Sequence, residues 1–147
     1  MKRQSFSFIF KGISQEQFAV FPEIYTANGS KSFSINLQYH YAVNERLIGC
    51  ESIVDFAEQN KIFLRCGLLC GFEIDEDSWK ERFNRQYNAV HLAREVYEHF
   101  AAFTVGTLRG YLHAMQRDSM VSATLPPVNV VDLLKDFEPY PIEMTDM

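Results

Sequence analysis

Three side chains that could bind a metal ion, His91, Glu95 and His99, follow one another at intervals of four residues. On an α-helix this interval places them on one face, where two imidazoles and a carboxylate could hold zinc. The alternative is an exposed helix face on which Arg94 and Glu98 form a weak ion pair in solvent. Exposed charged faces are the commoner use of such a pattern, so we predict no metal and no cofactor.

Catalytic motifs are missing from the rest of the sequence. It contains no Gly-x-Ser-x-Gly elbow, no phosphate-binding glycine loop and no dinucleotide-binding fingerprint, and its carboxylates form no acid–base pair. Its three cysteines, Cys50, Cys66 and Cys70, cannot all pair within one chain, and no further ligands complete a zinc site around them. We therefore predict a protein that is not an enzyme, with no catalytic residues and with thiols that pack as small hydrophobic side chains.

The composition predicts a folded chain with more aromatic side chains than one small core needs. Of its 147 residues 47% are hydrophobic, and 13 phenylalanines and 7 tyrosines contribute to an aromatic share of 14%. A chain of this length most simply forms one domain, with a core over about residues 4–137 and a frayed tail from about Glu138. Some aromatic side chains are therefore candidates for an interface or a groove.

Charge and hydropathy exclude several classes of partner. The net charge of −5 and the lack of any run of five or more Lys and Arg argue against nucleic acid. No segment approaches the roughly 20 apolar residues of a membrane span. Residues 1–4 are basic, but the apolar stretch after them is too short for a signal peptide. We expect a cytoplasmic protein.

The elements that must position these side chains begin with strand-like segments. Apolar and polar residues alternate most clearly over residues 33–43, as in a half-buried strand. Gly12 interrupts the first segment, and residues 28–30 have the composition of a turn. We predict a four-stranded antiparallel sheet with strands at residues 5–11, 33–43, 46–58 and 61–74, and a separate short apolar segment at residues 18–22.

The last two strands must pair in one particular register. Their core residues are even-numbered in both strands, so a slip by one residue would turn those side chains toward solvent. Even-with-even pairing places Cys50 opposite Cys70 and predicts a hairpin loop of three residues. Strands of this length are about twice the usual one, so their edges predict further pairing between copies of the chain.

A helical pattern of apolar residues follows the sheet and runs to about Arg117. Asp77 and Ser78 can cap its start, and Ser78 and Glu81 have the capping-box spacing. One straight helix of that length would exceed a compact domain of this size, so we predict a break near residues 87–88 between a short and a long helix.

Two glycines, Gly106 and Gly110, lie four residues apart within the long helix. They make a flat strip that allows close approach of the sheet or of a partner helix. A tolerated irregularity, which costs about 1 kcal/mol per glycine relative to alanine, is the alternative.

Two consecutive prolines follow the long helix. Residues 125–129 read Leu-Pro-Pro-Val-Asn, and such a pair cannot lie inside a helix, so it predicts an extended strap before a short apolar segment. In residue order this strap resembles the C-terminal signature of the SecB family of protein-export chaperones, with Val130 in place of the family's aromatic residue. The order of elements over about residues 4–137 also resembles that family, as does the run at residues 71–74.

The resemblance implies an α+β fold and a chaperone function. Members of the SecB family are homotetramers, dimers of dimers, that hold unfolded polypeptides in apolar grooves and deliver them to the ATPase SecA for export. We therefore expect a SecB-like holdase whose partners are unfolded or partly folded polypeptides, because adaptable aromatic surface suits many clients. Six candidate peptide-binding residues, for each of which core packing is the commoner assignment, are expected to cluster where the last strand, the short helix and the strap meet: Phe72, Phe83, Tyr87, Leu112, Leu125 and Val128.

Departures from the family pattern leave other functions open. Aligned from the strand end, Arg65 replaces the acidic residue that helps the family engage SecA. Residues 104–109 replace the Phe-Pro-Tyr-Ala-Arg-Glu entry to the long helix, and residues 143–147 lack the small, basic tail. The alternatives are a dedicated chaperone of a single partner, such as a toxin–antitoxin antitoxin, and a SecB-fold protein that binds a small molecule or metal without chaperone activity.

Overall fold

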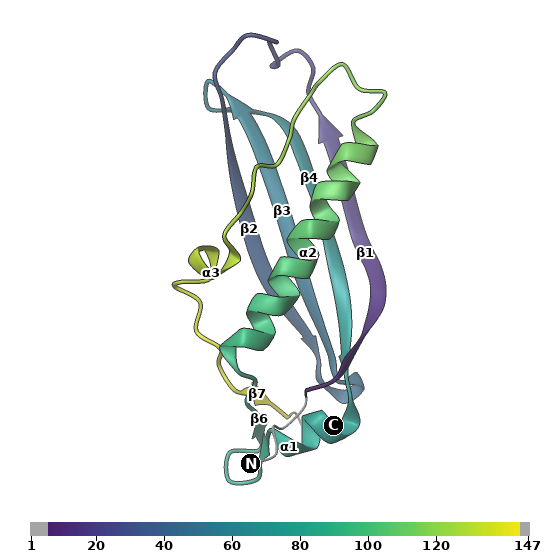
Figure 1. Cartoon of the computed structure of the whole chain (residues 1–147), viewed down its shortest axis with the longest axis vertical. Coiled ribbons are helices and arrows are strands. Elements are labelled where there is room, and N and C mark those ends of the chain that lie inside the picture. Colours follow the sequence, from purple (N-terminus) through teal and green to yellow (C-terminus); the bar gives the residue numbers. More distant parts are fainter. Residues whose placement is uncertain (1–5, 145–147) are drawn as a thin grey trace.

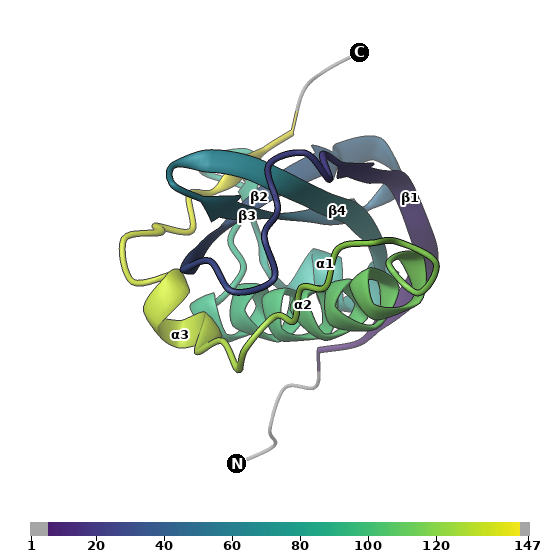
Figure 2. The ribbon, with the colours of Figure 1, turned by 90° about the horizontal axis from the view of Figure 1, so that it is seen from above.

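The computed structural model describes residues 6–144 and contains a four-stranded antiparallel sheet in the order β1-β4-β3-β2. The long helix α2 crosses one face of this sheet diagonally, and no helix of the described residues covers the other face (Figures 1 and 2). The predicted α+β fold, a four-stranded antiparallel sheet followed by a short and a long helix, is confirmed. The main elements are β1 Phe8–Val20, β2 Lys31–Ala42, β3 Leu47–Glu58, β4 Lys61–Ile74, α1 Glu76–Glu81 and α2 Arg94–Met115, with a 3-10 turn at Val43–Glu45.

The core lies between α2 and the sheet. Side chains of a strand alternate between its faces, and the even-numbered residues of β3 and most of those of β4 are buried beneath the helix, as predicted. The rings of Phe72 in β4 and Phe100 in α2 stack with their centroids 4.2 Å apart. The helix contributes seven buried residues to this layer: Tyr97, Phe100, Ala101, Thr104, Val105, Leu108 and Leu112.

The β3–β4 hairpin confirms the predicted register but not the predicted loop. Cys50 lies opposite Cys70, as expected from the even-with-even pairing. The loop, however, has two residues and not three: Gln59 and Asn60, with φ angles of 52° and 65°. Positive φ at both positions is the geometry of a type I′ turn, whose twist matches that of the strands.

A bulge in β4 reconciles the short loop with the register. The pairing shifts between Phe56 and Ala57, so that Ala57 lies opposite Ile62 and Phe56 opposite Leu64. The extra residue, Phe63, is itself fully buried. A bulge inserts one unpaired residue into a strand, which supplies the one-residue offset that we had assigned to the loop.

The first strand is continuous, contrary to the prediction of a break. β1 includes Gly12 and the start of the segment predicted separately at residues 18–22, and it pairs with β4 throughout. Two register shifts, one before Gly12 and one around Gln15, absorb the irregular sequence, and both residues have positive φ. Pairing with β4 therefore overrides the local break signal, because a bulged strand tolerates a glycine in this conformation.

One buried hydroxyl gives a direct test of the packing beneath α2. Ser52 in β3 is fully buried opposite Leu37 and Leu68, and its Oγ is the one buried side-chain polar atom of residues 6–144 without a hydrogen-bond partner. An unpartnered buried hydroxyl costs about 1–3 kcal/mol. We expect Ser52→Ala to raise the free energy of unfolding by about 1 kcal/mol and the Tm by about 2–4 °C.

Thermal unfolding measures this effect, with Ser34→Ala as the matched control because Ser34 is exposed in β2. The control is expected to leave the Tm unchanged. A lower Tm for Ser52→Ala would contradict the prediction and would mean that the hydroxyl has a partner in solution.

The helical region breaks where predicted, but α1 begins earlier than expected. Its N-cap is Asp75, whose carboxylate accepts a hydrogen bond from the backbone amide of Ser78 at 3.4 Å. The predicted caps, Asp77 and Ser78, were wrong, because Asp75 directly follows β4 and already caps the helix. The segment between the helices includes Asn88, with a φ of 48°. None of the helices in residues 6–144 is long and apolar enough to cross a lipid bilayer.

A small second sheet joins this break to the C-terminal segment. It has the order β5-β6-β7, with the strands Phe83–Asn84, Ala89–Val90 and Ile142–Glu143. We expected the tail to fray from about Glu138, yet Ile142 is buried and Met144 accepts from and donates to Asn88 at 3.0 and 2.9 Å. Residues 145–147 of that tail, and residues 1–5 with their predicted basic start, lie outside the described residues.

The strap is extended, as the two prolines predicted. Residues 121–129 form neither helix nor strand, and Asn129 ends the strap as the N-cap of α3, Val130–Leu133. Its side chain accepts hydrogen bonds from two backbone amides of α3 at 3.0 and 3.2 Å. Arg109 of α2 donates to the carbonyl oxygens of Leu125 and Pro126 at 3.2 and 3.0 Å, which fixes the strap to the helix.

Glu58 ties the loop between β1 and β2 to the end of β3. Its Oε1 accepts a hydrogen bond from the Thr26 hydroxyl at 2.7 Å, its Oε2 accepts one from the Thr26 amide at 2.9 Å, and Lys31 Nζ lies 3.4 Å from Oε1. The pKa of the Glu58 carboxyl lies below its ordinary value, mainly because its ionised form accepts the hydrogen bond from the Thr26 hydroxyl. Desolvation acts in the opposite direction and only partly offsets this effect.

The lowered pKa of Glu58 predicts a loss of stability in acid. A lowered folded-state pKa stabilises the fold above the ordinary carboxyl pKa, and this contribution disappears as the pH falls through the folded-state value. We expect the free energy of unfolding to decrease below about pH 4.5, and Glu58→Gln to be less stable at neutral pH with a shallower decrease in acid. Denaturant unfolding over a pH series measures both, with Thr26→Val expected to be intermediate. Equal slopes for the wild type and Glu58→Gln would contradict the assignment.

Candidate functional site

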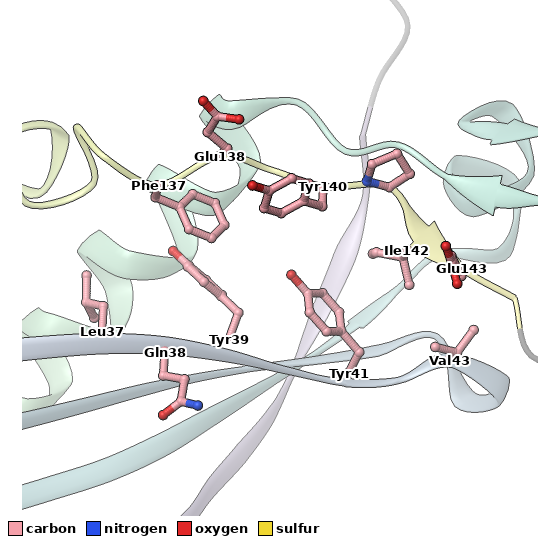
Figure 3. A pocket seen from close by; sticks show the side chains of 11 residues that line it. Leu37, Gln38, Tyr39, Tyr41, Val43, Phe137, Glu138, Tyr140, Ile142 and Glu143 are labelled. Carbon is pink, nitrogen blue, oxygen red and sulfur yellow. The ribbon is translucent and has the colours of Figure 1, made fainter. Parts of the chain in front are cut away.

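A cavity of about 620 Å³ lies between β2 and the segment that follows α3. Figure 3 shows Tyr39 and Tyr41 extending from β2 toward Phe137 and Tyr140 of that segment, whereas Gln38 points to the other side of the strand. This arrangement follows from the alternation of β2, which places its odd-numbered side chains on the α2 side of the sheet. The cavity is lined by Leu37, Gln38, Tyr39, Tyr41, Val43, Phe137, Glu138, Tyr140, Pro141, Ile142 and Glu143.

Two rings that line this cavity, Tyr39 and Phe137, pack against the buried ring of Tyr97 in α2. The ring centroids of Tyr39, Tyr97 and Phe137 lie 4.9 to 5.1 Å apart in each pair. The Tyr39 hydroxyl donates to the carbonyl oxygen of Tyr97 at 2.5 Å, and the Tyr41 hydroxyl donates to that of the Tyr97 side chain at 3.2 Å. The hydroxyls of Tyr39 and Tyr41 thus both bond to Tyr97, which leaves the carbon surface of Tyr39 and Tyr41 to line the cavity.

The cavity is apolar and has an acidic rim. Burial raises the pKa of Tyr39 and of Tyr97 above the ordinary phenol value, so both hydroxyls stay protonated at neutral pH. Glu138 and Glu143 are the charged residues of the lining. The site therefore suits apolar side chains, and a neighbouring basic residue in the same ligand would gain from the carboxylates.

Arg94, at the start of α2, fixes the outer wall of the cavity. Its guanidinium donates to the carbonyl oxygen of Leu134 at 2.7 Å and to that of Phe137. The predicted ion pair with Glu98 was wrong: it is not among the ion pairs of the described residues, and the guanidinium is directed to the segment that follows α3 instead. Arg94 thereby joins α2 to the segment that carries Phe137 and Tyr140.

The predicted helical alignment of His91, Glu95 and His99 does not occur. His91 precedes α2, which begins at Arg94, and the ring of His99 packs against Phe8 with the centroids 5.5 Å apart. Within residues 6–144 no group of three His, Cys, Asp or Glu side chains is arranged to hold a metal ion.

The three thiols are free and buried, as predicted from their number and spacing. Burial raises the pKa of Cys50 to about 11 and that of Cys66 to about 12, and it also raises the pKa of Cys70. They therefore stay protonated at neutral pH and pack as small hydrophobic side chains.

The six predicted peptide-binding residues do not converge on one site. Phe72, Leu112 and Leu125 belong to the core, with exposed fractions of 0%, 1% and 2%. Leu112 and Leu125 also border a cavity of about 430 Å³ beside the C-terminal half of α2. Val128 is half-buried in the strap. For Phe72 the core assignment leaves no surface that a client could contact.

The other two predicted residues, Phe83 and Tyr87, lie near the end of the molecule that is remote from Leu112 and Leu125. Phe83 lines a cavity of about 450 Å³ with Trp79 and Arg85, and Tyr87 is 68% exposed in the loop between β5 and β6. Figure 1 shows that this end of the molecule is remote from the C-terminal end of α2. The predicted meeting point of last strand, short helix and strap was therefore wrong, while a role of the individual residues in peptide binding stays a prediction.

The residues that line the main cavity were missed for two reasons. The alternation of residues 33–43 identified Tyr39 and Tyr41 as residues on the core side of a strand, but it carried no sign that this strand forms the sheet edge. Phe137 and Tyr140 lie at or near the tail that we expected to fray. Their aromatic character was the available signal, since aromatic side chains are uncommon in disordered tails.

Arg65 lies on the face of the sheet that no described helix covers. Its Nε and Nη2 donate to the two carboxylate oxygens of Asp55 in β3 at 2.6 and 2.9 Å, a bidentate ion pair. The charge reversal noted in the sequence is thus neutralised by a neighbouring strand.

Comparisons with known proteins return a distant structural similarity. No protein-family model matches the chain, and no curated protein matches it. Among solved structures it is similar to the SecB-like chaperone Rv1957 of Mycobacterium tuberculosis in complex with a ChAD peptide from the Rv1956 HigA1 antitoxin. The sequence identity is 11% and the TM-score 0.43, and the match covers 83% of this chain and 91% of that chain.

Proposed function

We propose that this protein is a SecB-like chaperone that holds unfolded or partly folded polypeptides, with the cavity beside β2 as its binding groove. The observation that carries the proposal is an open cavity of about 620 Å³ with aromatic walls. Two of the aromatic residues that line it are exposed, Tyr140 to 73% and Tyr41 to 41%. Exposed aromatic surface around a cavity is typical of a binding site, and an apolar lining accepts many sequences.

The electrostatics of the groove define its clients further. An apolar wall with Glu138 and Glu143 at its rim favours apolar segments that are flanked by Lys or Arg. Such segments are buried in folded proteins and are exposed only during folding or unfolding. The groove therefore distinguishes unfolded from folded polypeptides without any catalytic chemistry.

Suppression of client aggregation tests the proposal. We expect the wild type to prevent light scattering by a chemically unfolded protein at stoichiometric ratios, and Tyr140→Ser to weaken this effect. Tyr87→Ser is the matched comparison, because Tyr87 is a tyrosine of similar exposure, 68% against 73%, at a different place. If Tyr87→Ser but not Tyr140→Ser weakened the suppression of aggregation, the binding site would have to be assigned to the β5–β6 loop. A wild type that does not suppress aggregation would refute the proposed function.

Assembly into a homotetramer, a dimer of dimers, is part of the same proposal. The uncovered side of α2 carries the small residues Ala102, Gly106, Gly110 and Ala114, all exposed. A Cβ at Gly106 or Gly110 would meet no atom within 4 Å, so the predicted close approach of the sheet was wrong. A partner helix and a tolerated irregularity both stay open for this strip, and the proposed assembly uses the first. Light-scattering mass measurements test the assembly, and a monomer at every concentration would contradict it.

A dedicated chaperone for a single partner is the second candidate, because the ion pair of Arg65 and Asp55 occupies the face where the resemblance places SecA docking. Direct binding of the wild type to purified SecA distinguishes the two. The exchange variant Asp55→Arg/Arg65→Asp keeps the ion pair and restores a carboxylate at position 65. Binding of SecA by the wild type favours a chaperone for export. Binding of SecA by the exchange variant but not by the wild type favours a dedicated chaperone of a single partner. Of the third alternative, a SecB-fold protein that binds a small molecule or a metal, the metal is not proposed, since the described residues hold no ligand cluster. Binding of a small molecule stays a prediction.

A further inference from the structure

We infer that a client segment binds by adding a strand to the free edge of β2, so that its alternate side chains enter the cavity beside that strand. The inference rests on the proposed chaperone function and specifies how its groove holds a polypeptide. Its basis is the coincidence of an unpaired sheet edge with an apolar cavity on the same residues.

The edge of β2 is regular and carries neither bulges nor the residue types that usually block pairing. All twelve residues of β2 pair with β3 without a register shift, and no backbone hydrogen bond joins its other edge to a described residue. Between residues 32 and 42 the strand contains no proline, glycine, lysine, arginine or carboxylate. Proteins commonly block exposed edges with such residues or with bulges.

The opposite edge of the sheet shows the contrast. β1 has two register shifts against β4 and positive φ at Gly12 and Gln15. Bulges of this kind twist an edge strand and disrupt the regular spacing of its backbone donors and acceptors. Of the two sheet edges, β2 is therefore the one that can accept a further strand along its length.

The backbone groups that face outward from β2 follow from the hairpin geometry. Residues that flank a two-residue loop exchange both backbone hydrogen bonds, so Glu58 bonds to Lys61 in β4. At the other end of the β3–β4 pair, the Ile74 amide donates to the carbonyl oxygen of Arg46 at 2.8 Å. Arg46 directly precedes β3 and, like Glu58, has an even number. Even-numbered residues of β3 thus bond to β4, and odd-numbered ones bond to β2.

The odd-numbered residues of β3 lie opposite even-numbered residues of β2, for example Glu51 opposite Gln38. The odd-numbered residues of β2 must then direct their N–H and C=O groups to the free edge. Leu37, Tyr39 and Tyr41 are odd-numbered, and their side chains line the cavity. The same three residues therefore offer backbone hydrogen bonds at the edge and apolar surface in the cavity.

An added antiparallel strand satisfies both features at once. Residues directly opposite one another in a sheet place their side chains on the same face, so each client residue bonded to Leu37, Tyr39 or Tyr41 extends its side chain into the cavity. Backbone hydrogen bonds supply affinity that does not depend on sequence, and the cavity selects apolar residues at alternate positions. The occupant is thus an extended segment with alternating apolar residues and basic residues between or beside them.

A second copy of the chain fits this edge less well than a client segment does. Residues 137–143 stand beside β2 and form the far wall of the cavity (Figure 3). A second copy would bring the same wall next to its own β2, and the two walls would compete for the space beside the paired edges. A separate extended segment has no such wall.

Backbone N-methylation of a short peptide tests the inference. The probe carries leucine at alternate positions with serine and lysine between them, and two variants carry N-methyl groups either on the leucine amides or on the intervening amides. Side chains are identical in all three peptides, so a difference reports the backbone alone. We expect methylation of one set to lower the affinity at least tenfold and methylation of the other set to leave it within about twofold.

The outcomes separate the inference from the function on which it rests. Loss confined to the leucine amides indicates an antiparallel strand, and loss confined to the intervening amides indicates a parallel one; both support strand addition. Equal affinities, or equal losses, of the two methylated peptides would overturn strand addition while leaving the chaperone function intact. Failure of the unmodified peptide and of unfolded proteins to bind would refute the function itself. A change in oligomer mass on peptide binding would mean that a second copy occupies the edge.

Discussion

Phe72→Ala is expected to lower the free energy of unfolding by about 3–5 kcal/mol. Phe72 is fully buried in β4, stacks on Phe100 and contacts three further phenylalanine rings at centroid distances of 5.5 to 5.9 Å. Removing its ring deletes these contacts and leaves a void that close-packed neighbours fill only in part. Because small domains are stable by about 5–15 kcal/mol, the variant would lose a large fraction of its stability.

Urea unfolding measures this loss as a lower midpoint at an unchanged slope. Phe103→Ala is the matched control: Phe103 belongs to the same aromatic cluster but is 41% exposed, so its removal is expected to cost clearly less. The comparison also separates the two assignments of Phe72. A Phe72→Ala variant with normal stability and weakened client binding would restore its role as a groove residue and contradict the core assignment.

The burial of Phe72 is one of the features that the sequence pattern was able to predict. Alternation along residues 46–58 and 61–74 was sufficient to place the core side chains and to pair Cys50 with Cys70, because burial on one face of a strand is a local property. The bulge at Phe63 was not predictable in this way. It depends on how a two-residue turn fits the twist of both strands, and several loop lengths are compatible with the same alternation.

The candidate groove was beyond the sequence pattern for a related reason. Tyr39 and Tyr41 carry the same alternation signal whether β2 lies at the centre or at the edge of the sheet, so strand order decides their role. The far wall depends on Arg94, which binds the carbonyl oxygens of Leu134 and Phe137 in the segment after α3. Backbone acceptors are the same at every residue, so nothing in the sequence marks Leu134 and Phe137 as the partners of a particular arginine.

Arg94→Met is expected to weaken client binding about tenfold or more and to lower the free energy of unfolding by about 2–4 kcal/mol. The substitution keeps an extended side chain but removes both donors, so the carbonyl oxygens of Leu134 and Phe137 lose a charged partner. The segment after α3 then loses its link to α2, and with it the position of Phe137 and Tyr140 in the cavity wall. A groove without its far wall offers a client less apolar contact.

Arg109→Met is the matched control, because Arg109 makes the same kind of bond from the same helix to Leu125 and Pro126. It holds the strap beside the cavity of about 430 Å³ that includes Leu112 and Leu125, and it is absent from the lining of the groove beside β2. Both variants are expected to lose comparable stability, whereas the affinity for an unfolded client, measured at a temperature where both are folded, falls for Arg94→Met alone. If both variants lost affinity equally, the whole segment after α2 would be the binding element and the groove beside β2 would have no separate role. If only Arg109→Met lost affinity, the site would lie at the C-terminal half of α2, where two of the residues predicted from the sequence, Leu112 and Leu125, are found.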